Sequence, residues 1–238
     1  MSEFANMLVS KKCFVWDFDG CLCDSENAHY RAYNKAFQCF GHSIKESEYY
    51  ASFTHLGNGT EREIAKYNVA CSASEIAVLK NSAYHELIVN NEIPLFREIP
   101  EIIKRMKAHG AKVAIASNSP IEELQGILSH TDIFGDFDLI VGRTPELRKK
   151  PFPDLFLRAI SGLGVSSSEV LIFEDADKGL EAAFAAHCDT VWMRTRYNAT
   201  LSTSFPIVAS LTHHQLLEQV RQAFASARLL KNQCDVAN

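Results

Sequence analysis

Two aspartates directly follow a short apolar run near the beginning of the sequence. Cys13-Phe14-Val15-Trp16 has the composition of a buried strand, and Asp17-Phe18-Asp19-Gly20 comes next. Residues i and i+2 of a strand share a face, so both carboxylates are expected at the C-terminal edge of a sheet, where open α/β sheets bind ligands. Two neighbouring carboxylates repel each other unless a cation or a proton separates them. A divalent metal ion with a phosphorylated substrate meets that need, because hard cations prefer oxygen ligands.

Three later segments place further polar groups next to predicted elements. They are Ser117-Asn118-Ser119 after the apolar stretch 112–116, Lys150 before Pro151-Phe152-Pro153-Asp154, and Glu174-Asp175 at the end of the apolar stretch 170–174. A hydroxyl group and the backbone N–H groups of a helix start can bind an anion. Each motif also has a structural alternative: a solvated Asp-x-Asp-Gly turn, an N-cap serine or an exposed lysine. Two acidic pairs, a serine and a lysine at strand ends together favour a catalytic site.

The elements that position these residues are strands alternating with helices. Strands separated by helices of about 10–15 residues are typical of βαβ units. We therefore expect an α/β fold with a Rossmann-like parallel sheet core. The predicted strands are 13–17, 112–116, 138–142, 170–174 and 190–193, and the predicted helices beyond residue 96 are 99–109, 121–130, 153–163, 178–187 and 212–228, with 229–238 frayed.

The residues between the first two strands have a different pattern. Apolar side chains recur at helical spacing through much of 26–91, and the loop Leu56-Gly57-Asn58-Gly59-Thr60 interrupts the helix. The pattern predicts an inserted all-helical cap domain of residues 26–94, over the edge of the sheet. The catalytic core then consists of residues 1–25 and 95–238.

Composition limits the class of protein. The chain has 238 residues, 47% of them hydrophobic, with a formal net charge of −5. The chain has no long run of basic residues, so it lacks the positive charge that binds the phosphates of nucleic acid. No apolar stretch reaches the roughly 18 residues of a membrane span. MSEFANMLVSKK at the beginning has the reverse charge order of a secretory signal. The seven scattered cysteines fit reduced thiols in a cytoplasmic protein, and Cys21-Leu22-Cys23 lacks the spacing of a zinc site.

The four motifs together resemble those of the haloacid dehalogenase-like hydrolases, which are mostly phosphatases. The matching segments are Asp17-Phe18-Asp19-Gly20, Ser117-Asn118-Ser119, Lys150-Pro151-Phe152-Pro153-Asp154 and Glu174-Asp175-Ala176-Asp177-Lys178-Gly179. The resemblance extends from about residue 12 to about residue 220. The helical insertion and Asp24-Ser25-Glu26 resemble the branch that contains phosphoglycolate phosphatases, sugar-phosphate phosphatases and β-phosphoglucomutase.

The resemblance implies how the acidic residues would act. Asp17 would attack phosphorus and form an aspartyl-phosphate. Asp19 would protonate the leaving oxygen and then deprotonate the attacking water, which argues against dehalogenation because a halide needs no proton. Mg²⁺ would be held by the Asp17 carboxylate, the Asp19 backbone carbonyl and Asp175, with Glu174 reaching it directly or through water.

The resemblance also assigns residues to the phosphoryl group. Ser117 would hydrogen-bond a phosphoryl oxygen, with Asn118 beside it in the substrate site. Lys150 would neutralise charge on Asp17 and on the transferred group. Asp177 and Lys178 are expected on the surface at the start of a helix.

Residues of the predicted cap would determine the substrate specificity. His29, Tyr33 and Lys80 match positions that β-phosphoglucomutase uses near its active site, and Asn58 with Gly59 would shape the pocket for the leaving group. Each has a structural alternative: His29 and Tyr33 are i, i+4 neighbours that can pack within a helix, and Lys80 can be a solvated lysine.

Thr60 separates a phosphatase from a mutase. It stands where the mutase has the arginine that grips the distal phosphate of its substrate, and Arg62 lies two residues further on. Losing a bidentate arginine weakens the far end of a bisphosphate most. We therefore expect a phosphatase acting on a small, sugar-like phosphate monoester, with a β-phosphoglucomutase-like mutase as the alternative.

A catalytically idle binding module is the alternative from another class, and the presence of every motif residue disfavours it. The expected partner is a small phosphorylated metabolite, with no nucleic acid and no membrane. A monomer is expected, with a dimer as the alternative.

Overall fold

The computed structural model describes residues 1–50, 53 and 59–236. Within it the chain divides into two compact units. The sheet unit consists of Met1–Cys23 and Leu95–Asn238, and the helical unit consists of Asp24–Pro94.

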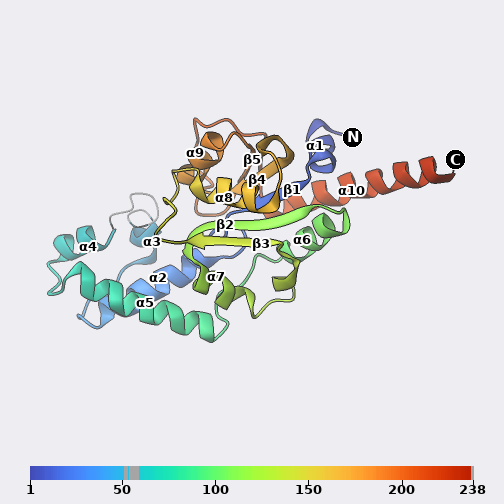
Figure 1. Cartoon of the computed structure of the whole chain (residues 1–238). Helices are drawn as coiled ribbons and strands as arrows, with labels where there is room; N and C mark the ends of the chain where they lie inside the picture. The colour runs from blue at the N-terminus through green and yellow to red at the C-terminus, as the bar shows by residue number, and fades with distance from the viewer. Residues whose placement is uncertain (51–52, 54–58, 237–238) are drawn as a thin grey trace. The chain divides into compact units, whose positions relative to one another are not determined.

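The sheet unit is built on six parallel strands (Figure 1). Their spatial order is β3 (Leu139–Arg143), β2 (Lys112–Pro120), β1 (Cys13–Trp16), β4 (Val170–Glu174), β5 (Asp189–Met193) and β6 (Ala209–Leu211). This order confirms the predicted Rossmann-like parallel sheet. It reverses beside β1: the chain moves outward from β1 through β2 to β3 and then returns to the other side of β1 as β4. Ligands bind at such a switch point, outside the carboxyl ends of the strands.

The central strand β1 has all four side chains fully buried, as expected for a parallel strand covered on both faces. Val15 packs into the apolar cluster on one face, and Trp16 stacks on Phe173 of β4 with 4.0 Å between ring centroids. Trp16 also pairs in register with Phe173. The residues that follow these two, Asp17 and Glu174, therefore reach the same edge of the sheet.

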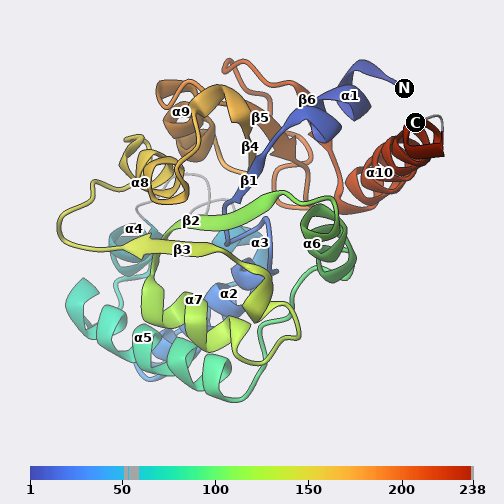
Figure 2. The same ribbon diagram turned by 45° about the vertical axis from the view of Figure 1, so that its right-hand side comes forward.

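Helices cover both faces of the sheet (Figure 2). One face packs against α8 (Asp154–Leu163) and α9 (Asp177–Ala185), whose apolar sides share a buried cluster with Val15, Ala114 and Ile172. The other face carries α6 (Ile99–Ala108), α7 (Ile121–Leu128) and α10 (His213–Val236), with α1 (Glu3–Ser10) packed against α10. Two short 3-10 helices, Phe134–Asp136 and Ser167–Glu169, lie in the connections.

The helical unit contains α2 (Ser25–Gln38), α3 (Glu46–Tyr49), α4 (Gly59–Tyr67) and α5 (Ala73–Val89). Helices α2 and α5 pack along each other. Their apolar cluster includes Phe37, Tyr49 and Ile76. A capping box starts α5: the Ser72 hydroxyl accepts from the N–H of Glu75, whose carboxylate accepts from the N–H of Ser72.

Several local predictions differ from the structure. Helix α1 was not predicted; Ser2 caps it, and Ala5 and Leu8 are its buried side chains. Strand β6 was missed because three residues are too few to show a period. Helix α10 continues to Val236. The prediction that residues 229–238 are frayed was therefore wrong for 229–236, a stretch in which leucine, lysine and glutamine favour helix.

The predicted loop in the helical unit also needs correction. Gly59 and Thr60 are the first residues of α4 and not part of a loop. A side chain at Gly59 would lie 2.1 Å from the ring of Phe53, so close packing of that ring explains the glycine. Gly57 and Asn58 lie outside the described residues. In the described part of the chain, no helix combines the length and apolar character that crossing a membrane requires.

The packing of α8 gives a test of the core. Phe156 is fully buried, whereas the next residue, Leu157, is 44% exposed. Phe156→Ala should lower the free energy of unfolding by about 3–5 kcal/mol because it leaves a cavity, whereas Leu157→Ala should change it by about 0.5 kcal/mol or less. Urea unfolding of both variants measures the difference. Equal losses would contradict the burial of Phe156 against the sheet.

Candidate functional site

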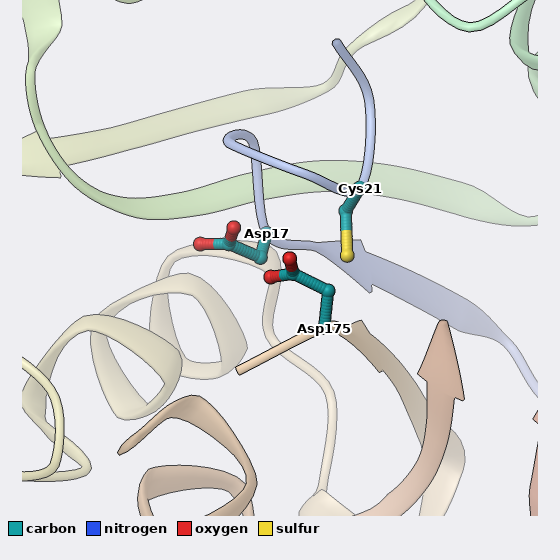
Figure 3. A group of neighbouring side chains, drawn as sticks. All are labelled: Asp17, Cys21 and Asp175. Atoms are coloured by element: carbon teal, nitrogen blue, oxygen red, sulfur yellow. The ribbon is translucent and has the colours of Figure 1, made fainter. Parts of the chain in front are cut away.

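Two aspartates and a cysteine meet at the switch point of the sheet. Asp17 directly follows β1, Asp175 directly follows β4, and Cys21 lies in the turn after Asp17. One potential ligand atom of each residue lies within 4.8 Å of the other two. Figure 3 shows the three side chains converging, with the carboxyl groups of Asp17 and Asp175 next to each other. The structure therefore brings together Asp17 and Asp175, which were predicted from separate motifs.

A buried lysine links the acidic residues of the two strands. The Lys150 ammonium donates to Asp17 Oδ1 at 2.5 Å and to Glu174 Oε1 at 2.6 Å. All three side chains are at least nine-tenths buried. The second oxygen of Glu174 accepts from the backbone N–H of Ala176 at 3.0 Å. Lys150 is thus a structural partner of both acids, and both carboxylate oxygens of Glu174 accept hydrogen bonds from within the protein.

Asn118 positions this lysine. Its Oδ1 accepts from the backbone N–H of Lys150 at 2.8 Å, and its Nδ2 donates back to the carbonyl of Lys150 at 3.5 Å. The amide thus pairs with both backbone groups of one residue. Asn118, predicted as a substrate-binding residue, therefore lies at the site and holds Lys150 in the structure.

Burial and charge together set the electrostatics. Burial raises the pKa of Asp17, and the negative charges of Glu174 and Asp19 raise it further against the opposing charge of Lys150. Burial acts to lower the pKa of Lys150, but Asp17 and Glu174 raise it on balance, so the ammonium form is retained. The carboxyl groups outnumber the single ammonium group. A divalent cation bound by oxygen atoms would offset the excess negative charge, and the donor set fits Mg²⁺.

Asp19 is held by two serines at the end of β2. Ser119 Oγ donates to Asp19 Oδ2 at 2.6 Å, and Ser117 Oγ lies 3.5 Å from the same oxygen. The N–H of Ser119 in turn donates to Ser117 Oγ at 3.0 Å. Ser117 was predicted as a site residue; Ser119 was not, although its place two residues later in the same motif was the available signal.

Two glycines make room for the carboxylates. Gly20 has φ +79°, and a Cβ there would lie 2.1 Å from Asp175 Oδ2. A Cβ at Gly179 would lie 1.7 Å from Glu174 Oε1. Each acid of the second pair therefore packs against a backbone that only glycine allows. Asp177 and Lys178, within the fourth motif, are exposed as predicted.

Three further residues support the site from distant parts of the sequence. Asn198 Nδ2 and Trp192 Nε1 both donate to the carbonyl of Asp175, at 2.8 and 2.9 Å. His213, at the start of α10, places Nε2 2.8 Å from the carbonyl of Cys21. Sequence reasoning missed all three, because no local pattern links them to the motifs that they support.

The predicted residues of the helical unit form a group of their own. His29 stacks on Tyr84 with 4.2 Å between ring centroids. The Lys80 ammonium lies 4.6 Å from the centre of the Tyr84 ring and 5.6 Å from that of Tyr33. Helices α2 and α5 thus bring His29 against Tyr84, and Lys80 close to both Tyr33 and Tyr84.

The remaining predicted residues lie in the first turns of α4. Thr60 is half-buried and Arg62 is exposed there, and Gly59 is the first residue of the helix. Asn58 lies outside the described residues.

A known protein family and several known proteins resemble this chain in sequence. A model of the haloacid dehalogenase-like hydrolases matches residues 11–187. CbbY of Rhodobacter capsulatus is 32% identical over 197 residues, which cover 78% of this chain and 86% of that protein. The fructose-1-phosphate phosphatase YqaB of Escherichia coli is 27% identical over 186 residues, which cover 76% of this chain and 95% of that protein.

A solved structure shows the same fold. The crystal structure of CbbY from Rhodobacter sphaeroides in complex with phosphate is similar with a TM-score of 0.71 and 23% identity, and the match covers 87% of this chain and 96% of that one. The family match spans most of the chain and contains all four motifs. The predicted family and enzyme class are confirmed: this chain belongs to the haloacid dehalogenase-like hydrolase family.

Proposed function

We propose that the chain is a magnesium-dependent phosphatase that hydrolyses a small, sugar-like phosphate monoester through an aspartyl-phosphate. The observation that carries the proposal is the buried Asp17 carboxylate, bound by Lys150 at 2.5 Å and lying beside Asp175 at the switch point of the sheet. The name of the relative YqaB, a fructose-1-phosphate phosphatase, supports a sugar phosphate as the substrate class.

Asp17 is the nucleophile in this proposal. Its hydrogen bond to Lys150 fixes the orientation of the carboxylate, and the ammonium charge offsets the negative charge that develops on the transferred group. Attack forms a bond between an Asp17 oxygen and phosphorus and breaks the bond from phosphorus to the leaving oxygen. Water then cleaves the aspartyl-phosphate and releases inorganic phosphate.

The residues that would hold Mg²⁺ are the Asp17 and Asp175 carboxylates and the backbone carbonyl of Asp19. When bound, the ion supplies positive charge that draws the phosphate oxygens toward Asp17 and separates the two carboxylates. A metal contact by Glu174 stays a prediction. Its hydrogen bonds to Lys150 and Ala176 support a role in holding the lysine.

Asp19 is the general acid and base. The 2.6 Å bond from Ser119 fixes its side chain, so Ser119 acts as a positioning residue. Asp19 gives a proton to the leaving oxygen and takes one from the water that attacks the aspartyl-phosphate. The Ser117 hydroxyl, which already accepts from the N–H of Ser119, would donate its own hydrogen to a phosphoryl oxygen.

The helical unit is proposed as the cap domain of residues 26–94, with the core formed by 1–25 and 95–238. The ammonium and aromatic rings that gather around Tyr84 suit a polar, hydroxylated leaving group. We assign His29, Tyr33 and Lys80 to it, with Asn58 and Gly59 shaping its pocket. Thr60 in place of an arginine favours hydrolysis over transfer to a second hydroxyl.

Replacing the nucleophile tests the mechanism. Asp17→Asn should lower phosphate release by about a thousandfold or more, because an amide cannot attack phosphorus and is a poorer metal ligand. Asp177→Asn is the matched control, since Asp177 is exposed and outside the site. The measurement is phosphate release from a panel of phosphate esters that includes fructose 1-phosphate. Activity of Asp17→Asn within about tenfold of the unaltered protein would overturn the assigned role of Asp17.

Metal removal tests the second part of the proposal. Exhaustive chelation should abolish phosphate release, because Asp17 and Asp175 would then repel the substrate, and added Mg²⁺ should restore it. The measurement is release from the best ester of the panel before chelation, after it and after metal addition. Full activity in the chelated protein would contradict the metal-binding roles.

Product analysis separates the phosphatase from the mutase. The protein is incubated with β-glucose 1-phosphate, with and without a catalytic amount of the 1,6-bisphosphate. Little glucose 6-phosphate should form, because Thr60 cannot grip a distal phosphate as an arginine would. Free phosphate from some sugar phosphate should be the main product.

The mutase alternative makes the opposite prediction. Glucose 6-phosphate formed faster than free phosphate, and only with the bisphosphate, would show that the phosphatase assignment is wrong. Arg62 would then supply the distal grip, and Arg62→Ala should remove the mutase activity selectively.

A further inference from the structure

One carbonyl group at the edge of the sheet accepts hydrogen bonds from two side chains. It belongs to Asp175, which directly follows β4, and the last register pair between β4 and β5 is Glu174 with Trp192. The carbonyl of Asp175 lies past this pair, and side chains satisfy it. Asn198 Nδ2 donates to it at 2.8 Å and Trp192 Nε1 at 2.9 Å. Two donors thus fix the peptide group that joins Asp175 to Ala176.

The N–H of the same peptide group is bonded as well. The N–H of Ala176 donates to Glu174 Oε2 at 3.0 Å, and the other oxygen of Glu174 accepts from Lys150 at 2.6 Å. Donors on a peptide carbonyl polarise the group and strengthen the hydrogen bond that its N–H makes. A single peptide plane therefore connects Asn198 to the buried ion pair of Lys150.

Asn198 is itself held by its own loop. It is 4% exposed and lies in the connection from β5 to β6. Its Nδ2 also donates to the carbonyl of Met193 at 2.8 Å, and its Oδ1 accepts from the N–H of Thr195 at 2.9 Å. Both hydrogens of the amide nitrogen are used, so the direction of the donor to Asp175 is fixed.

Asp175 is confined from its backbone and from its side chain. The Trp192 indole is buried, and the Arg194 guanidinium lies 4.0 Å from the centre of its ring, which fixes the position of the indole N–H. The carboxylate of Asp175 packs against Gly20, where a Cβ would lie 2.1 Å from Oδ2. A ligand that is already oriented loses less conformational freedom when it binds.

We propose that Asn198 and Trp192 are positioning residues that set the affinity of the site for a divalent cation by fixing the peptide group between Asp175 and Ala176. The inference rests on the proposed role of Asp175 as a metal ligand. Residues that orient a metal ligand without contacting the metal typically contribute about 10–100-fold to metal affinity. Asn198 and Trp192 act on the cation only through Asp175.

The test is Mn²⁺ binding to the full-length protein, measured from the loss of the electron paramagnetic resonance signal of the free ion. Mn²⁺ is the probe because, like Mg²⁺, it suits oxygen ligands. Asn198→Ala should weaken Mn²⁺ binding by about 10–100-fold. Trp192→Phe, which keeps an aromatic ring and removes one N–H donor, should weaken it by about two- to tenfold.

Asn34→Ala is the matched control. Asn34 Oδ1 accepts from the N–H of Ile44 at 2.9 Å, so this asparagine also fixes a connection, but within the helical unit. Its loss should leave the affinity for Mn²⁺ unchanged. Kinetics give a second readout: Asn198→Ala should raise the Mg²⁺ concentration for half-maximal phosphate release, and excess Mg²⁺ should restore most of kcat. A merely structural role would lower the melting temperature without moving either metal readout.

Unchanged Mn²⁺ affinity in Asn198→Ala would overturn the inference. If Asn198→Ala does not fold, Trp192→Phe decides the matter by the same criterion. Asp175→Asn separates this inference from the proposed function, because it should lose most of the Mn²⁺ binding. Binding as tight as that of the unaltered protein would refute the metal-binding role of Asp175. Lost binding in Asp175→Asn, with unchanged binding in the two positioning variants, would refute this inference alone.

Discussion

The buried ion pair between Lys150 and the acids Asp17 and Glu174 is the interaction on which the rest of the site depends. Charges removed from water are costly unless partners compensate them, and here one ammonium group contacts one acid from each of two adjacent strands. The lysine is itself held by Asn118 through its backbone. Four segments that are far apart in the sequence therefore meet at this ion pair.

The parallel sheet makes that placement possible. Strands β1 and β4 are neighbours in register, and the connections that leave them run in opposite directions, which opens space at their carboxyl ends. Gly20 and Gly179 then allow the carboxylates of Asp175 and Glu174 to press against backbone. Close packing of this kind keeps charged groups within a few ångströms of one another and limits their freedom to rearrange. The site is in this sense prepared before a substrate arrives.

Sequence reasoning succeeded where the signal was local. The apolar run before Asp17 and the one that ends in the acidic pair Glu174-Asp175 predicted both strands and the meeting of their carboxylates. It failed where a role depends on distant contacts: Asn198, Trp192 and His213 have ordinary local surroundings, and only the fold brings them to the site. Helix α1 was missed because a single amphipathic turn or two gives a weak periodic signal.

The contact between His213 and the turn at Cys21 spans 192 residues, and the one between Lys150 and Asp17 spans 133. Asp17 is thus synthesised well before the lysine that it binds and the histidine that supports its turn. Strand β1 has no hydrogen-bonded neighbour at first, because β2 and β4, which pair with it, are synthesised much later. A growing chain therefore cannot complete these contacts until His213 has been translated, and transiently exposed apolar strands such as β1 favour aggregation during that interval.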